Sequence, residues 1–239
     1  MIAKAIDKII SIADPYMTQI NGSTYSSKPL YRCDTDLRAD PICCKTLTGL
    51  MAFIQANAQD LAGLEYFLHV TSHRKVELVS GLDEDRKRET LMIAQAEPPT
   101  LPVGDFYDNE SFLIGVQANF IPTEDRALVL QFAGTVTDGT ITDYKDDGVT
   151  QKATIRQGIK GKTEAVVPSP CTLSPYRTFH EVEQPESNFI FRMRSGVRGP
   201  ECALYEADGG AWKHIAMDNI KEYLKARLKD AGIEMEVIA

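Results

Sequence analysis

The sequence predicts an α+β fold in which helices pack on one face of antiparallel β-sheet. Three observations favour this class. Short β-rich runs separated by turn residues occur on both sides of a proline-rich break. Apolar residues at helical spacing occur before the first of these runs and again after the break. The chain closes with an apolar stripe over residues 212–232, which predicts a long C-terminal amphipathic helix.

The N-terminal segment is expected to contain two helices joined by a loop. A lysine-interrupted apolar pattern predicts a short amphipathic helix that ends before Pro15. Residues 15–45 are rich in turn residues and predict a loop with one short strand. A second stripe predicts a helix that stops at Gly63. The apolar positions are Ile2, Ile6, Ile9 and Ile10 in the first helix, and Leu47, Leu50, Met51, Ile54 and Leu61 in the second.

Three β-rich runs then predict an antiparallel meander, over residues 64–72, 75–81 and 88–95. The break that follows holds three prolines and a glycine and is the best candidate for a domain boundary or a crossover. We therefore predict an N-terminal helix and meander region, a proline-rich connection and a C-terminal α+β region, which together form one compact unit. Their ranges are 1–96, 97–108 and 109–239.

After the break, residues 109–120 predict a helix with Asn109 as its N-cap. Residues 123–134 fit either a helix capped by Thr123 or a strand. The next part of the chain is mostly of strand pattern, in the runs 135–144, 149–159, 171–182, 188–195 and 201–207. The final helix is expected to end at Gly232, with an apolar stripe of Trp212, Ile215, Ala216, Ile220, Tyr223, Leu224 and Leu228.

Composition and charge narrow the range of functions. A net charge of −8 and a pI near 5.1 argue against a protein that coats nucleic acid without regard to sequence, since such a protein needs a basic surface. Five irregularly spaced cysteines fit a reducing compartment better than a disulfide framework. The N-terminal residues 1–17 contain no apolar run long enough for a signal peptide or a membrane span. We expect a cytoplasmic protein with no membrane partner.

Each candidate catalytic or cofactor motif in the sequence lacks a residue or a spacing that the chemistry requires. Residues 156–163 end like a phosphate loop, but Arg156 replaces a required glycine and no helix is expected to follow. The acidic run at 142–148 lacks calcium-loop spacing and predicts a hairpin turn. His180 and Glu181 are neighbours in a predicted strand, where their side chains would point to opposite faces. We expect no enzyme activity and no cofactor.

Zinc is not predicted either, because the candidate ligands lack the regular spacing of a zinc site. The interpretation we favour is buried thiols and surface histidines. The residues considered are Cys33, Cys43, Cys44, Cys171, Cys202, His69 and His73.

One strand stands out because it alternates bulky apolar residues with arginine. Counting by two puts Phe189, Phe191 and Met193 on one face, which predicts a core, and Arg192 and Arg194 on the other. The two arginines either pair with carboxylates of the sheet or form an anion-binding or partner-binding patch. The candidate residues for such a patch are Arg177, Arg192, Arg194 and Arg198, and Arg156 is an additional candidate.

From residue 108 onward, the order of elements resembles the YfdQ family of phage and prophage proteins. The resemblance lies in a helix-rich segment, hairpins around 143–159, the strand that holds Arg192 and Arg194, and the C-terminal amphipathic helix. It implies a bacteriophage or prophage protein that acts in the bacterial cytoplasm. It brings no catalytic residues with it.

These observations lead to three functional hypotheses. The first is a non-enzymatic accessory protein that binds a host or phage protein, antagonism of a host defence factor being one form of this. The second is a nucleic-acid or nucleotide-binding accessory of phage replication or recombination, in which the four arginines contact phosphates. The third is a structural homo-oligomer that assembles through exposed strand edges.

Overall fold

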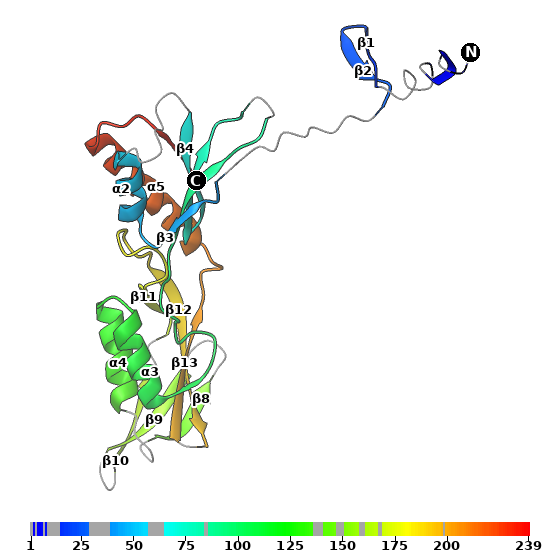
Figure 1. Cartoon of the computed structure of the whole chain (residues 1–239). Helices are drawn as coiled ribbons and strands as arrows, with labels where there is room; N and C mark the ends of the chain where they lie inside the picture. Colours follow the sequence, from blue (N-terminus) through cyan, green and yellow to red (C-terminus); the bar gives the residue numbers. More distant parts are fainter. Residues whose placement is uncertain are drawn as a thin grey trace. The chain divides into compact units, whose positions relative to one another are not determined.

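The structure is a computed structural model, and it shows an α+β fold (Figure 1). It describes residues 2, 4–6, 8, 15–28, 39–56, 65–83, 86–135, 141–146, 151–157, 161–166, 169–197 and 199–239, with only the backbone described from 141 to 166. The chain divides into two units: unit 1 is Met1–Ala39 and unit 2 is Asp40–Ala239. The predicted stripe positions Ile9, Ile10 and Leu61 and the predicted stop at Gly63 lie outside the described residues.

Unit 1 contains helical residues at 2, 4–6 and 8, where a helix was predicted, followed by a β-hairpin. Strands β1 (Met17–Ile20) and β2 (Ser23–Ser26) pair antiparallel. Asn21 and Gly22 connect them with φ angles of 51° and 80°. Positive φ at both central residues is the requirement of a type I′ turn, which Asn-Gly satisfies with little strain. The prediction of a single short strand in residues 15–45 was wrong, because it overlooked this turn signal.

In unit 2, a five-stranded sheet has the order β14-β4-β5-β6-β3. Its centre is the predicted antiparallel meander of β4 (Tyr66–Ser72), β5 (Lys75–Ser80) and β6 (Thr90–Gln95). The edge strands β3 (Ile42–Cys44) and β14 (Glu236–Ile238) pair parallel to β6 and β4. The sheet is therefore mixed, whereas the sequence predicted antiparallel pairing throughout.

Two helices cover this sheet, and the buried side chains between the helices and the sheet form a hydrophobic core that we call core 1. The helices are α2 (Leu47–Ala56) and α5 (Trp212–Asp230), and Figure 1 shows them close together. As predicted, α5 stops at Gly232, which has a φ of 67°, and Ile233 N–H donates to Leu228 O at 3.0 Å. Ile215 was expected on the buried stripe but is 48 % exposed, because the buried face of α5 is narrower than the apolar pattern.

The second sheet has four strands in the order β11-β12-β13-β7, all antiparallel. The strands are β7 (Tyr107–Asp108), β11 (Cys171–Leu173), β12 (Ser187–Gly196) and β13 (Gly199–Glu206). Helices α3 (Asn109–Asn119) and α4 (Glu124–Thr135) pack on one face and form core 2 with it. Phe189, Phe191 and Met193 are buried there, as the alternation predicted.

The N-cap of α4 agrees with one of the two sequence predictions, whereas the N-cap of α3 differs from the predicted residue. Residues 124–135 are helical, and Thr123 Oγ1 accepts from Arg126 N–H at 3.1 Å, as the helical interpretation required. The N-cap of α3 is Asp108 and not Asn109, since Asp108 Oδ1 accepts from Ser111 N–H at 2.9 Å. Residues 171–182 form a strand only at β11. Beyond it the chain runs as an irregular segment held by side-chain hydrogen bonds.

A third sheet has three antiparallel strands in the order β10-β9-β8. They are β8 (Ile141–Asp146), β9 (Gln151–Gln157) and β10 (Gly161–Val166). Gln157 pairs with Gly161, so the phosphate-loop-like stretch leads into a strand and not into a helix. The predicted turn residues Asp147 and Gly148 and the side chain of Arg156 lie outside what the structure describes.

Candidate functional site

The structure places the predicted arginines at different ends of the β12–β13 hairpin. Arg194 pairs with Glu201 near the turn, and Arg177 pairs with Glu206 at the other end of β13. The two glutamates are five residues apart on one strand, which is roughly 17 Å. Arg177 therefore does not join Arg194 in one patch. Arg198 lies outside the described residues.

Arg177 is a buried cation, with 1 % of its surface exposed. Its Nη1 donates to Glu206 Oε1 at 2.9 Å, and its Nη2 donates to Pro185 O at 3.0 Å and to Ser187 Oγ at 2.7 Å. The guanidinium lies over the Trp212 ring, 3.8 Å from the centroid. Burial lowers the pKa of Arg177, and the negative charge of Glu206 opposes that shift. These contacts use the side chain inside the protein.

Arg177 belongs to a segment between β11 and β12 that is held by buried polar side chains. The Gln184 side chain organises it: Oε1 accepts from Arg177 N–H at 3.0 Å and Thr178 N–H at 3.2 Å. Its Nε2 donates to Phe179 O at 2.8 Å and Val182 O at 3.2 Å. A buried amide with all of these partners replaces the backbone pairing that a strand would supply. The buried polar residues are Ser174, Arg177, Thr178, Gln184 and Ser187.

The same segment connects the two cores of unit 2. Phe179 and Val182 belong to core 1, although the strands on either side of the segment belong to core 2. Glu181 Oε1 accepts from Thr48 N–H at 3.1 Å, at the start of α2. His180 and Glu181 lie in a turn and not in the predicted strand. The Glu181 carboxylate is therefore part of this connection, whereas His180 is exposed.

We call Arg177, Glu206 and Trp212 the Arg177 cluster. His73 lies beside this cluster, in the turn between β4 and β5. Its ring is 4.7 Å from the Trp212 ring in an edge-on arrangement, and its backbone oxygen accepts from Thr178 Oγ1. Burial lowers the pKa of His73 to about 4, and the charges of Arg74, Lys213 and Arg177 act in the same direction. The imidazole is therefore neutral at pH 7.

Near the turn of the hairpin, Arg194 forms an exposed counterpart of the Arg177 cluster. Its Nε donates to Glu201 Oε2 at 2.7 Å, and its guanidinium lies 4.0 Å from the centroid of the Phe106 ring. Phe106 also meets Tyr205 edge-on at 6.3 Å. The Arg194 side chain is 57 % exposed. We call the residues Phe106, Arg194, Glu201 and Tyr205 the Arg194 strip.

Arg192 shares the outer face of β12 with Arg194 but has a different setting. It is half-buried, and its Nη1 donates to Ser169 Oγ at 3.4 Å and to Phe191 O at 3.3 Å. The prediction that the two arginines are neighbours on one sheet face is confirmed. Their guanidinium groups have separate hydrogen-bond partners.

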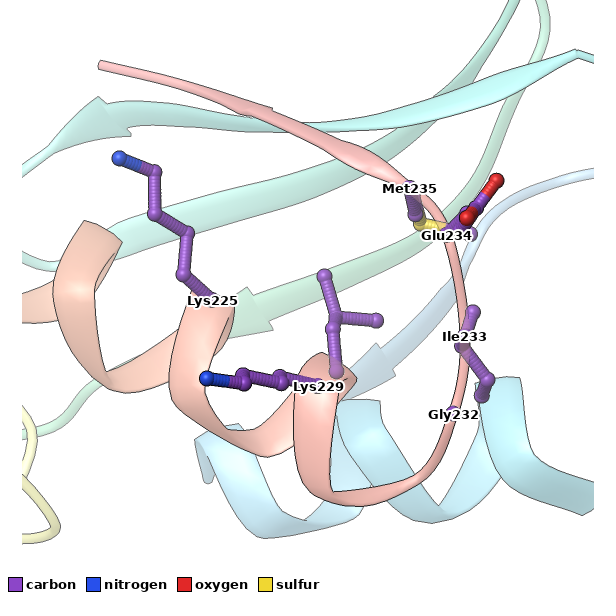
Figure 2. A pocket seen from close by; sticks show the side chains of 7 residues that line it. Lys225, Lys229, Gly232, Ile233, Glu234 and Met235 are labelled. Atoms are coloured by element: carbon purple, nitrogen blue, oxygen red, sulfur yellow. The ribbon is translucent and has the colours of Figure 1, made fainter.

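Figure 2 shows an open groove of about 390 Å³ where the end of α5 meets the segment that leads into β14. Lys225 and Lys229 extend from α5, and Lys225 pairs with Glu222 at 2.9 Å. Both lysine side chains point away from Glu234 on the opposite wall. The groove is therefore lined by both apolar and charged residues, and its lysines do not converge with Glu234. Its lining residues are Lys225, Leu228, Lys229, Gly232, Ile233, Glu234 and Met235.

Unit 1 carries a surface of a different kind. Every described residue from 2 to 28 is exposed, although many of these side chains are apolar. Large hydrophobic side chains there are between 50 % and 79 % exposed. We call these residues the unit 1 apolar surface, and they are Ile2, Ile6, Tyr16, Met17, Ile20 and Tyr25.

The cysteines follow the predicted pattern only in part. Cys171 and Cys202 are buried, and burial raises the pKa of each thiol to about 12. Cys43 is exposed, against the expectation of a buried thiol, because it lies in an edge strand. Cys33 lies outside the described residues. Within the part of the chain that the structure describes, no three His, Cys, Asp or Glu side chains are grouped to hold a metal ion.

No helix among the described residues has both the length and the apolar character to cross a membrane. Comparisons with family models, with curated proteins and with solved structures give no match for this chain.

Proposed function

We propose that the chain is a non-enzymatic accessory protein of a bacteriophage or prophage that binds another protein of the bacterial cytoplasm through unit 1. The unit 1 apolar surface is the observation that carries this proposal. Exposed apolar residues scattered singly are normal on a protein surface, but six large ones in the described part of unit 1, none of them buried, favour a binding role. Antagonism of a host defence factor is one form that this binding takes.

The hairpin of unit 1 gives the physical reason why this unit should bind a partner. All eight residues of β1 and β2 are exposed, so the hairpin buries no side chain of its own. A two-stranded hairpin with no packed face is marginally stable in water. Burial against a partner would supply about 25 cal/mol for each Å² of apolar surface removed from water. Docking on a partner therefore stabilises the hairpin and the complex together.

Features of unit 2 favour binding over catalysis. The two buried thiols have raised pKa values and are not nucleophilic thiolates at pH 7. His73 packs on Trp212, and Arg177 is occupied by internal partners. These titratable groups therefore support the fold of unit 2, while unit 1 offers the contact surface.

The proposal is tested by photo-crosslinking in cells that express the full chain. A benzophenone amino acid replaces Ile6 or Tyr25 in unit 1, and matched controls carry it at Leu128 or Ile215, which are exposed hydrophobic positions of unit 2. We expect both unit 1 positions to give an adduct with the same protein, and the controls to give none of it.

Two outcomes would count against the proposal. Equal adducts from all four positions would show that exposure alone explains the crosslinks. An adduct of twice the chain mass from Ile6 and Tyr25 would replace the proposal with the homo-oligomer. Substituting Ile6→Asp and Tyr25→Asp together should then remove the specific adduct, because a charge in an apolar interface loses its hydration.

A further inference from the structure

We infer that the Arg194 strip of unit 2 is a second binding surface, which recognises a protein segment presenting a carboxylate beside an apolar side chain. Arg194 and Glu201 lie on the outer faces of β12 and β13, on the side of the sheet away from core 2. The inference rests on the geometry of this sheet and does not depend on unit 1.

Phe106 is fixed on this face by its backbone. Gly104 N–H donates to Leu204 O at 2.8 Å, just before Phe106, and Tyr107 pairs with Cys202 just after it. Tyr107 packs on core 2, so its neighbour Phe106 points to the opposite face of the sheet. The ring therefore reaches Arg194 and Tyr205 without the entropy loss of ordering a free side chain.

Arg194 is held in a conformation that leaves one edge of its guanidinium open. Glu201 takes the Nε–H, and Phe106 covers one face of the group. The described part of the chain provides no partner for Nη1 and Nη2 of Arg194. A guanidinium with a free pair of N–H donors binds a carboxylate through two parallel hydrogen bonds.

A glycine allows Glu201 to take this position. A Cβ atom built at Gly196 would clash with the carboxylate of Glu201, so any other residue there would displace it. The pair Arg194–Glu201 is therefore set by the local backbone as well as by its own charges.

Charge selects the class of ligand. Unit 1 has five Lys or Arg and four Asp or Glu, so the net charge of −8 for the whole chain leaves −9 on unit 2. A nucleic-acid strand, with its closely spaced phosphates, would be repelled by unit 2 and by Glu201 beside Arg194. A single protein carboxylate carries far less charge and still matches the open edge of the guanidinium.

The residue types agree with a protein ligand. Arginine and tyrosine are enriched among residues that contribute most of the binding energy in protein interfaces. Tyr205 is half-buried, and the described residues offer no hydrogen-bond partner for its hydroxyl. That hydroxyl is free to bind a backbone group of the ligand, while the Phe106 ring contacts an apolar side chain.

The test is a titration of the full chain followed by NMR, with acetyl-valyl-aspartyl-valine amide as the probe. The matched probe replaces aspartate by asparagine, which has the same shape without the charge. We expect the Nε–H signal of Arg194 and the ring signals of Phe106 to shift with a Kd of about 1 mM for the aspartyl probe. Binding of the asparaginyl probe should be at least about fivefold weaker.

Two lysine variants distinguish a loss of peptide recognition from a loss of folding. Arg194→Lys keeps the charge but removes the bidentate edge, so it should weaken the aspartyl probe at least about fivefold. Arg227→Lys is the matched control, because Arg227 also lies over a ring, that of Tyr223, but has no place in the strip. It should leave probe binding unchanged. Thermal unfolding checks that both variants fold.

Equal binding of the two peptides, or equal effects of the two substitutions, would overturn the inference. A third arm uses an oligothymidylate of eight nucleotides at the same salt concentration. If it shifts the Arg194 signal at lower concentration than the aspartyl peptide does, the strip is a nucleic-acid site, and a protein carboxylate is not its ligand.

Discussion

The two ends of the β12–β13 hairpin carry the same chemistry in opposite surroundings. At one end, Arg177 pairs with Glu206 at 2.9 Å and lies 3.8 Å from the centroid of the Trp212 ring. At the other end, Arg194 pairs with Glu201 at 2.7 Å and lies 4.0 Å from the centroid of an aromatic ring. The exposed fractions of the two arginine side chains are 1 % and 57 %.

Burial, and not residue type, decides what an arginine–glutamate–aromatic cluster does. A buried guanidinium must pair its charge internally, because an unpaired charge away from water is destabilising, and Arg177 does so through Nη1 and Nη2. An exposed one is solvated, so its pairing contributes little to stability and its remaining donors stay available to a ligand. Each of the following substitutions probes one side of this contrast.

Arg177→Ala should have the largest effect. It removes the partner of Glu206 and leaves the buried acceptors Pro185 O and Ser187 Oγ without a donor. We expect the free energy of unfolding to fall by about 3 kcal/mol in urea denaturation. The matched variant Arg194→Ala should lose less than about 1 kcal/mol. Equal losses in the two variants would show that burial does not separate the roles of Arg177 and Arg194.

Gln184→Leu should have the next largest effect, because it tests the segment that holds Arg177 in place. It leaves the buried N–H groups of Arg177 and Thr178 unsatisfied, at a cost of about 2 kcal/mol in the free energy of unfolding. The exposed Gln131→Leu in α4 is the control and should change stability by less than about 0.5 kcal/mol. A loss as small as that of the control would mean that the segment is held mainly by its apolar side chains.

His73 should make the Arg177 end sensitive to acid. Its pKa of about 4 in the folded protein lies below its value of 6.5 in the unfolded chain, so the unfolded chain binds more protons between these pH values. Stability is unaffected above pH 6.5 and falls as the pH drops toward 4. With a discount for the solvent screening of this half-exposed side chain, we expect a loss of about 1 kcal/mol.

The measurement for His73 is the urea midpoint of the natural protein and of His73→Gln at pH 7 and at pH 4.5. The natural protein should lose more stability than the variant over this interval, because the two proteins differ only at position 73. An identical loss in the two proteins would show that His73 does not contribute to the acid sensitivity.

Gly196→Ala should have the smallest effect on stability and acts at the Arg194 end. The three atoms nearest to the added methyl group all belong to the flexible side chain of Glu201, so we expect a change of less than about 1 kcal/mol in the free energy of unfolding. The Nε–H signal of Arg194 should shift, because Glu201 must leave it. Gly134→Ala in α4, where a Cβ atom meets nothing within 4 Å, is the control and should leave that signal unchanged. An unmoved Arg194 signal in Gly196→Ala would contradict this account of the strip.

Period-two alternation was sufficient to place Phe189, Phe191 and Met193 in a core and to put Arg192 and Arg194 on the opposite face. Of the two alternatives for residues 123–134, the helix capped by Thr123 is the one that the structure shows. These predictions succeeded because the information lies within a few neighbouring residues.

The Asn21-Gly22 hairpin and the Asp108 cap were missed although their signals are local. Other features could not be predicted because they depend on residues distant in the sequence. Nothing near Arg177 shows that Glu206 and Trp212 enclose it, because they lie about thirty residues further along the chain. The parallel edge strands β3 and β14 pair with segments that neither adjoins in sequence. Phe106 lies in the proline-rich connection, and its alternation with Tyr107 spans too few residues for a pattern to show. A short strand has little local signal, and its partner decides its role.

A double-mutant cycle on both arginine–glutamate pairs tests the central contrast most directly. The free energy of unfolding is measured for Arg177→Ala, Glu206→Ala and their combination, and likewise for Arg194→Ala, Glu201→Ala and their combination. We predict a coupling energy of about 2 kcal/mol for Arg177–Glu206 and less than about 0.5 kcal/mol for Arg194–Glu201. Coupling energies that are equal, or larger at the exposed pair, would contradict the assignment of a structural role to Arg177 and a recognition role to Arg194.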